Sequence, residues 1–233
     1  MKTLGIIGGI APESTVEYYR QTIARYRERT AGGDYPSIII NSIDLKRLLA
    51  LVAGGQLEEL TDYLLAELSR LVSAGAQVGL LASNTPHIVF GELRARCPLP
   101  LISIVEAAAG ATRARGFRRV GLLGTRSTME SRFYPDAFGT QGIEVIAPFP
   151  DERDYVHGRY VGELVNGVFR DDTRQGVLAI LDRMRQRDRV EAVILGGTEL
   201  PLLFREGPAP NLPLLDTTRI HVDRAVEAML DSA

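Results

Sequence analysis

The feature that most constrains the fold is an apolar run that stops at a cluster of small polar residues, because the chain contains it at matching places in its two halves. Residues 79–82 lead into Ser-Asn-Thr at 83–85, and residues 193–196 lead into Gly-Thr-Glu at 197–199. Short apolar runs with polar neighbours are typical of buried strands in parallel sheets. Ligands of open α/β sheets bind just beyond the carboxyl ends of such strands. The sequence therefore predicts one site with two walls, one at each strand end.

The alternation of strands and helices in the first half recurs in the second. Ile7 and Leu122 are equivalent at a spacing of 115 residues, and Ser83 and Gly197 at a spacing of 114. Alternating strands and helices of this length imply parallel sheets with right-handed crossovers. We therefore expect an α/β fold with two similar domains, each a four-stranded parallel sheet flanked by helices. The domains are expected to be related by a pseudo-twofold axis, with an active-site cleft between them.

We assign residues 1–98 with 212–233 to the N-terminal half and residues 99–211 to the C-terminal half. The charged segment 151–172 is expected to be a helical excursion that could act as a lid. The expected strands are residues 4–7, 38–42, 78–81, 99–104, 120–123, 144–147, 193–195 and 212–215, and the expected helices include residues 16–29, 56–74, 88–96 and 105–115.

Composition and charge exclude several function classes. A formal net charge of −2 gives no basic field that would gather phosphate, so we expect neither nucleic acid nor a membrane as partner. No apolar run approaches the roughly 18 residues of a membrane helix. Cys97 is the single cysteine, which excludes an internal disulfide and thiolate zinc sites. With no cleavable leader in the sequence, we expect a cytoplasmic protein.

The motifs of nucleotide, hydrolase and metal sites are missing from the sequence. Gly8-Gly9 lacks the G-x-G-x-x-G spacing, although its turn could present N–H groups to an anion, with Ser14 or Thr15 capping the next helix. No P-loop or G-x-S-x-G elbow occurs. The three histidines, His87, His157 and His221, stand alone in sequence, so no metal or cofactor is expected.

Neutral donors gather instead at the predicted strand ends. Hydroxyls, amides and backbone N–H groups can together bind a carboxylate without a metal. The same residue types are also common helix caps and turn formers, and that alternative stays open for each of them. The candidate substrate-binding residues are Gly9, Ser14, Asn84, Thr85, Thr125, Ser127, Thr128 and Thr198.

Two ionisable residues lie next to these donors. His87 could act as a general acid or base, or it could be a neutral, hydrogen-bonded structural ring. Glu199 could act as a base, or it could pair with a local partner. The sequence leaves both alternatives open.

Four motifs together resemble a known family. They are Gly-Ile-Ile-Gly-Gly-Ile-Ala-Pro-Glu-Ser-Thr from Gly5, Asn-Thr-Pro-His from Asn84, Leu-Leu-Gly-Thr from Leu122, and Gly-Gly-Thr-Glu from Gly196. In this order they resemble the aspartate/glutamate (Asp/Glu/hydantoin) racemase superfamily, which works without pyridoxal phosphate. Its broad-specificity amino-acid racemase branch is further suggested by Tyr18, Asp44, Met129, residues 133–134 and residues 151–153.

The resemblance implies an isomerase that acts on the α-carbon of aspartate or glutamate, without cofactor and as a homodimer. In that family one thiol from each half flanks the α-carbon, one removing the proton and the other delivering one. The motifs usually read Cys-Asn-Thr and Gly-Cys-Thr-Glu, whereas this chain has Ser83 and Gly197 at the two positions. Cys97 is a poor substitute, because Pro98 and Pro100 place it in a connection.

The missing thiols leave three explanations open. One or both positions are engineered substitutions, or the chain is a natural member with a one-base reaction, or it is a binding protein without turnover. A cysteine-independent isomerase or lyase on a related carboxylate, using His87 or Glu199, belongs to the second explanation. In each case Ser83 and Gly197 mark the two faces of the α-carbon, and we expect the α-carboxylate to bind Asn84, Thr85 and Thr198, with Thr125 and Thr128.

Overall fold

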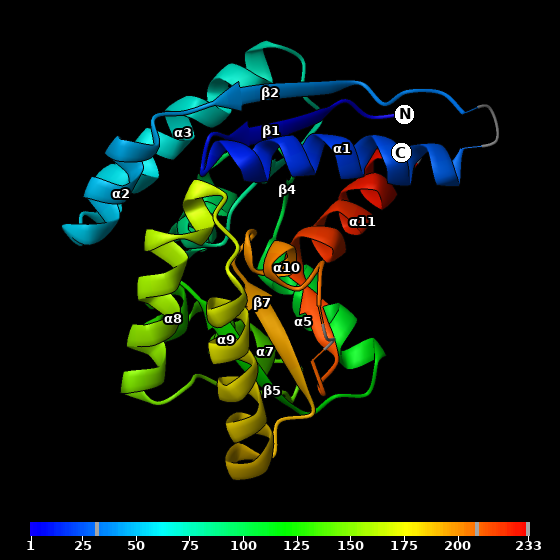
Figure 1. Ribbon diagram of the computed structural model, residues 1–233. Coiled ribbons are helices and arrows are strands. Elements are labelled where there is room, and N and C mark those ends of the chain that lie inside the picture. The colour runs from blue at the N-terminus through cyan, green and yellow to red at the C-terminus, as the bar shows by residue number, and fades with distance from the viewer. Residues whose placement is uncertain (31–32, 208–209, 232–233) are drawn as a thin grey trace. The chain divides into compact units, whose positions relative to one another are not determined.

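The computed structural model describes residues 1–30, 33–207 and 210–231. It divides into two compact units: unit 1 is Met1–Ile104 with His221–Ala233, and unit 2 is Val105–Ile220. Each unit contains one four-stranded parallel sheet with helices packed beside it (Figure 1). The sheets have the equivalent orders β2-β1-β3-β4 and β6-β5-β7-β8. The predicted fold class, two similar four-stranded α/β halves, is confirmed.

Unit 1 follows the predicted order of strands and helices, with one helix, α2, that was not predicted. Its elements are β1 (Leu4–Gly8), α1 (Pro12–Arg29), β2 (Ile38–Ser42), α2 (Leu45–Ala53), α3 (Leu57–Ser73), β3 (Val78–Leu81), the 3-10 helix η1 (Thr85–Val89), α4 (Phe90–Arg96) and β4 (Leu101–Ile102). The chain passes between the units in α5 (Ile104–Ala114) and α11 (Thr217–Leu230).

Both faces of the unit 1 sheet are covered, because successive side chains of a strand point to opposite faces. Leu4, Ile6 and Leu80 pack in one core cluster with buried residues of α1 and α11. Ile7 and Leu81 pack in another cluster with buried residues of α2, α3 and α4. This two-sided burial explains why the strands read as continuous apolar runs.

Unit 2 repeats this arrangement with different helices. Its elements are β5 (Arg119–Gly124), α6 (Arg126–Glu130), α7 (Phe133–Gly139), β6 (Glu144–Ile146), α8 (Pro150–Gly162), the 3-10 helix η2 (Leu164–Asn166), α9 (Asp171–Arg183), the π-helix η3 (Met184–Asp188), β7 (Ala192–Gly196), α10 (Leu200–Leu203) and β8 (Leu214–Asp216).

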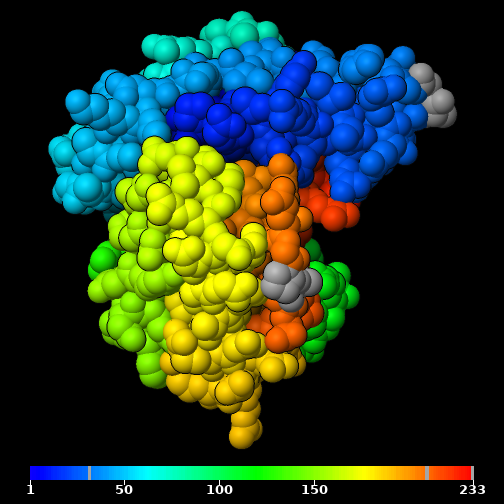
Figure 2. Space-filling model, in the orientation of Figure 1, coloured from blue at the N-terminus to red at the C-terminus, as the bar shows by residue number. Residues whose placement is uncertain are grey.

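The segment expected to be a helical excursion is part of the helix layer of unit 2. Val156 of α8 and Ile180 of α9 are buried in one core cluster with Leu123, Val193 and Leu195 of the sheet. In the space-filling view, α8 and α9 (yellow-green to yellow) form much of the visible surface of unit 2 (Figure 2). The helical prediction is right, but α8 packs on the sheet instead of leaving it, so the idea of a lid is not supported.

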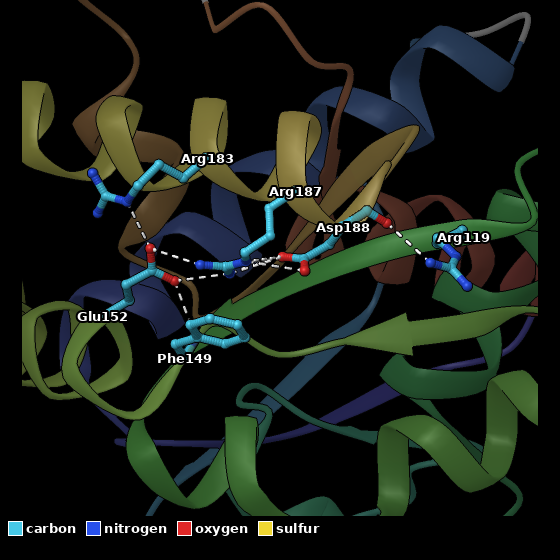
Figure 3. Close-up of polar contacts among 6 residues, drawn as sticks. All are labelled: Arg119, Phe149, Glu152, Arg183, Arg187 and Asp188. Carbon is cyan, nitrogen blue, oxygen red and sulfur yellow. Dashed lines mark hydrogen bonds and ion pairs between the residues drawn. The ribbon is translucent and has the colours of Figure 1, made fainter.

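A buried carboxylate fixes the start of α8 against α9 and η3 (Figure 3). Glu152 accepts from the Phe149 backbone N–H at 3.0 Å, from Arg183 Nε at 2.7 Å and from Arg187 Nη2 at 3.1 Å. The Arg187 guanidinium also lies over the Phe149 ring, 3.5 Å from its centroid, and pairs with Asp188 at 2.8 Å. One side chain thus caps α8 and joins it to α9 and η3.

The charge of Glu152 is stabilised by these contacts. Burial alone would raise the pKa of its carboxyl group, but the hydrogen bonds from Arg183, Arg187 and the Phe149 N–H outweigh burial and hold that pKa below its usual value. The network continues to the sheet, where Arg119 Nη1 of β5 donates to the Asp188 carbonyl at 3.1 Å (Figure 3).

The chain changes units later than the predicted boundaries at 98/99 and 211/212. The changes fall at 104/105 and 220/221. The physical reason is strand pairing: β4 hydrogen-bonds to β3 and stays in the first sheet, while β8 hydrogen-bonds to β7 and stays in the second. Residues 99–104 therefore belong with unit 1, and residues 212–220 belong with unit 2.

Several predicted ends also move. The first helix begins at Pro12 with Ala11 as N-cap, so neither Ser14 nor Thr15 caps it. Proline is favoured in the first turn of a helix because its missing N–H would have no intrahelical partner there. The helix predicted for residues 88–96 divides into η1 and α4, and the fourth strand is reduced to Leu101–Ile102. In the described part of the chain, no helix has the length and apolarity that a membrane span requires.

Candidate functional site

The end of β3 carries the first group of candidate residues. Ser83 is 8% exposed and Asn84 is also buried, and the chain turns directly into η1, which begins at Thr85 with Pro86 in its first turn. The tight turn keeps the polar residues 83–85 beside the strand end. Unit 1 therefore presents a hydroxyl, an amide and a second hydroxyl within three residues.

His87 is fixed as a neutral ring within unit 1. Its Nδ1 lies 3.0 Å from the Ser83 carbonyl, which can only accept, so Nδ1 carries the proton. Its Nε2 accepts from the Ile104 backbone N–H at 3.2 Å, and the ring stacks on Phe90. Burial, with His221 nearby, lowers the pKa of His87 to about 3. Both nitrogens are engaged by the backbone, so the geometry favours the structural alternative for His87 over the acid–base one.

A second buried histidine lies next to the first. His221 Nε2 donates to the Ile102 carbonyl at 3.0 Å, so its Nδ1 accepts from the Tyr18 hydroxyl at 2.8 Å. The rings of His87 and His221 are 6.2 Å apart. Burial lowers the pKa of His221 to about 4. The sequence analysis missed this group because its partners are 203 and 119 positions away along the chain.

The glycine-rich turn after β1 is occupied by its own contacts. The Gly9 N–H donates to Thr15 Oγ1 at 2.8 Å, and Gly9 has a φ of 82°. A Cβ on Gly9 would lie 2.7 Å from the Ile43 carbonyl oxygen, so glycine is required by both conformation and space. The Gly9 N–H is therefore used in closing the turn, and Ser14 is buried in the first turn of α1.

The end of β5 carries a cluster of three hydroxyls in unit 2. Thr125 Oγ1 is 3.0 Å from both Ser127 Oγ and Thr128 Oγ1, and it accepts from the Thr128 backbone N–H at 3.3 Å. Thr125 is the N-cap of α6. The capping alternative is thus realised for Thr125, and the structure brings all three candidates together.

The end of β7 combines a carboxylate with two hydroxyl groups. Glu199 is 3% exposed, and its Oε2 accepts from Thr198 Oγ1 at 2.9 Å and from the Tyr160 hydroxyl of α8. Glu199 thus has local hydroxyl partners in the same unit. It is the ionisable group nearest to Gly197 and Thr198 in sequence, and it differs from His87 in being held by side chains.

Tyr160 occupies the space of a side chain at position 197. A Cβ on Gly197 would lie 2.5 Å from Tyr160 Cε2, 2.7 Å from its hydroxyl oxygen and 2.8 Å from its Cζ. Carbon atoms do not approach so closely, so any larger residue at 197 requires the ring to move. Tyr160 is 6% exposed, and burial, with the negative charge of Glu199, raises the pKa of its phenol far above the usual value. The phenol is therefore protonated and donates to Glu199.

Strand pairing sets which candidates are neighbours. β1 pairs with β3, and β5 pairs with β7 with Gly124 beside Gly196. Unit 1 accordingly collects Gly9, Ser14, Ser83, Asn84, Thr85 and His87 at its two central strand ends, and unit 2 collects Thr125, Ser127, Thr128, Gly197, Thr198 and Glu199. Tyr160 is the residue that the sequence analysis missed in unit 2.

Sulfur and metal chemistry have few donors in the described residues. Cys97 is the C-cap of α4, where its N–H donates to the Leu93 carbonyl at 2.8 Å, as expected for a residue in the connection before β4. No group of three or more His, Cys, Asp and Glu side chains within the described ranges could hold a metal ion.

The two sheets and their polar strand ends define a class of protein, the two-domain α/β proteins with equivalent halves. Within it, the chain belongs to the Asp/Glu/Hydantoin racemase family, which matches residues 7–225. The resemblance stated from the motifs is therefore confirmed at the level of the family.

Solved structures and curated relatives agree with this assignment. A candidate Asp/Glu racemase from Yersinia pestis is 34% identical, with 99% of this chain and 100% of that chain covered and a TM-score of 0.89. An aspartate racemase homologue from Pyrococcus horikoshii is also 34% identical, with 99% and 100% covered and a TM-score of 0.85. A glutamate racemase from Parafrankia sp. (strain EAN1pec) is 36% identical over 154 residues, which are 62% of this chain and 51% of that protein. The matched region thus spans about half the length of that relative.

Proposed function

We propose that this protein binds a small acidic amino acid, aspartate or glutamate, and acts at its α-carbon as a cofactor-independent isomerase of the racemase type. Support comes from the family match over residues 7–225 and from the full-length similarity to a candidate Asp/Glu racemase and to an aspartate racemase homologue. Several curated relatives are glutamate racemases, which supports an acidic amino acid as the substrate class.

The observation that carries the proposal is the pair of buried polar strand ends at equivalent places in the two sheets. Asn84 and Thr85 follow β3, and Thr198 follows β7. Thr125, the N-cap of α6, and Thr128 of α6 follow β5, which pairs with β7. Neutral hydroxyl and amide groups can donate hydrogen bonds to a carboxylate without adding a charged side chain to the site. The candidate residues for the α-carboxylate are Asn84 and Thr85 in unit 1 and Thr125, Thr128 and Thr198 in unit 2. We propose that Ser83 and Gly197 stand at the two positions that flank the α-carbon.

A second candidate function is binding without turnover, and one observation favours it. Neither Ser83 nor Gly197 has a thiol, and Cys97 caps α4 instead. A hydroxyl needs an adjacent base to remove a proton, and glycine has no ionisable group. If no other group replaces the thiols, the protein would bind an amino acid and leave its α-proton in place.

The experiment that separates the two functions uses the wild-type protein with L- and D-aspartate and L- and D-glutamate. Isothermal titration calorimetry measures binding, and proton NMR in deuterated buffer follows the α-proton while optical rotation follows inversion. We expect saturable binding together with loss of the α-proton signal. Binding with a permanent α-proton would establish the binding-only function, and the absence of binding to all four compounds would refute both functions.

Three further expectations belong to the same proposal. We propose that the protein is cytoplasmic. We also propose that it forms a homodimer, and light scattering after gel filtration would test the dimer. The net charge of −2 supports a function without nucleic acid or membrane partners.

A further inference from the structure

We propose that Tyr160 and Glu199 form the group that takes up and returns the α-proton in unit 2, in the volume that a side chain at position 197 would otherwise fill. The inference rests on the proposed function, because it assigns a proton-transfer step to the same site. It adds a residue, Tyr160, that none of the sequence motifs includes.

The Tyr160 phenol lies directly beside Gly197. A Cβ at Gly197 would lie 2.7 Å from the Tyr160 hydroxyl oxygen and 2.8 Å from Cζ. The hydroxyl therefore lies where the side chain of residue 197 would begin. Position 197 marks one face of the α-carbon, so a hydroxyl in that volume takes the place of a side chain from β7.

The hydrogen-bond partner of the phenol is the Glu199 carboxylate. Tyr160 donates to Glu199 Oε2, which also accepts from Thr198 Oγ1 at 2.9 Å. Both residues are almost fully buried, at 6% and 3% exposure. A carboxylate bonded to a phenol can receive the phenolic proton at the moment when the phenol oxygen receives another.

Transfer of the α-proton to this pair needs no further reactant. The Cα–H bond of the bound amino acid breaks and a new O–H bond forms at the Tyr160 oxygen. At the same time the original Tyr160 O–H bond breaks and an O–H bond forms at Glu199. The α-proton is thus exchanged for a proton on Glu199, the electron pair stays on the substrate, and the reverse transfer restores the starting state.

The end of β3 in unit 1 has no equivalent ionisable pair among its candidate residues. His87 has both ring nitrogens bonded to backbone groups, and Ser83 contributes its carbonyl oxygen to one of these bonds. The end of β3 therefore offers neutral donors at positions 83–85, whereas the end of β7 offers an ionisable pair. Proton removal is accordingly faster on the face that unit 2 serves.

The test measures α-proton exchange of L- and D-aspartate and L- and D-glutamate by proton NMR in deuterated buffer. For the wild type we expect exchange in one enantiomer to outpace inversion of either. Tyr160→Phe and Glu199→Gln should each lower the saturated exchange rate by about 100-fold or more, while the dissociation constant changes by less than about threefold. A merely structural role would change binding and folding together instead of the rate at saturation.

The matched control is Tyr155→Phe, which removes a hydroxyl from the same helix. That hydroxyl contacts the Asp172 carbonyl at 3.4 Å, on the side of α9. Tyr155→Phe should leave exchange unchanged, and circular dichroism should show that all three variants are folded.

Four results would overturn the inference. Undiminished exchange in Tyr160→Phe would place the base elsewhere, and equal rates of exchange and inversion for both enantiomers would show two equivalent faces. Tight binding of the amino acids without exchange in the wild type would refute the proton-transfer pair but leave the binding function intact. Absence of binding would refute the proposed function and this inference together.

Discussion

At the scale of single residues, Gly197 and Tyr160 are coupled by packing. The Tyr160 ring fills the space in which a side chain at position 197 would lie. A cysteine at position 197 does not fit beside this ring. Its side chain would have to displace the buried Tyr160 ring, whose hydroxyl donates to Glu199. Any attempt to convert the strand end of β7 to the thiol pattern therefore requires a second change in α8.

This dependence predicts the outcome of a double-mutant cycle. Gly197→Ala should lower the free energy of unfolding by about 1–3 kcal/mol through overpacking. In a Tyr160→Leu background, which lacks the colliding ring atoms, the added cost of Gly197→Ala should fall by about 1–2 kcal/mol. Urea unfolding of the four proteins measures the coupling.

The matched control for this cycle is Gly158→Ala on α8, because a Cβ there would meet no atom within 4 Å. That change should be neutral or stabilising, since alanine is the better helix former. Strictly additive effects of the two changes at 160 and 197 would contradict the shared volume.

Residue by residue, the sequence identified the strand-end candidates but not their partners. Ser83, Asn84 and Thr198 could be found because they follow apolar runs directly. Tyr160 could not, because it contacts Glu199 across 39 positions of the chain. Contacts of this kind depend on the packing of α8 on the sheet, which periodicity alone does not specify.

At the scale of elements, Glu152 determines how α8 meets α9 and η3. Its carboxylate is 4% exposed and accepts from two guanidinium groups and one backbone N–H. Because α8 also carries Tyr160, the position of this helix on the sheet affects the strand end of β7. Glu152 thus acts on the candidate site only through the helix.

We expect Glu152→Gln to lower the free energy of unfolding by about 1.5–3 kcal/mol, because hydrogen bonds to charged groups contribute roughly this amount. The control is Asp136→Asn, which breaks the exposed pair with Arg132 in the first turn of α7 and should cost no more than about 0.5 kcal/mol. Chemical denaturation at neutral pH measures both. Equal small losses in the two variants would show that the Glu152 network contributes little.

Element boundaries were less predictable than element types. The sequence places a helix at residues 56–74, and α3 spans Leu57–Ser73, because the leucine spacing is regular. It does not predict α2 at Leu45–Ala53. It places the first helix start four residues late, because Ser14 and Thr15 resemble caps while Pro12 is the true first residue. Thr15 is used instead to close the turn at Gly9.

At the scale of the whole molecule, the two sheets follow from the repeat, but the passage between units does not. The equivalent apolar runs at Ile7 and Leu122 were sufficient to predict two matching halves. The observed unit boundaries differ from the predicted ones because the hydrogen bonds of β4 and β8 determine to which unit each strand belongs. The hydrophobic pattern does not reveal these hydrogen bonds.

The buried histidines predict how stability depends on pH. His87 and His221 have folded-state pKa values of about 3 and about 4, below the unfolded value of about 6.5. Their contribution is fully present above about pH 6.5, and it is lost as the pH falls, because the unfolded state binds protons that the folded state rejects. Between pH 6.5 and 4 the free energy of unfolding should fall by about 1.4 kcal/mol per pH unit for each histidine.

Urea unfolding between pH 7 and pH 4.5 measures this slope. His221→Gln should remove about one proton from it, and His157→Gln, at a partly exposed site of α8, should change it far less. If the histidine signals in NMR titrate near pH 6.5 for both His87 and His221, the burial argument is wrong.

The residues at positions 83 and 197, Ser83 and Gly197, also have a consequence for chemical durability. A thiolate is the protein group that peroxides and electrophiles attack most readily, and its higher oxidation states are irreversible. Ser83, Gly197 and their hydroxyl and carboxyl neighbours carry no such atom, and the single thiol of the chain caps a helix at Cys97. If an amino acid binds at these strand ends, as proposed, the side chains around it contain no thiol, and exposure to peroxides should leave binding unchanged.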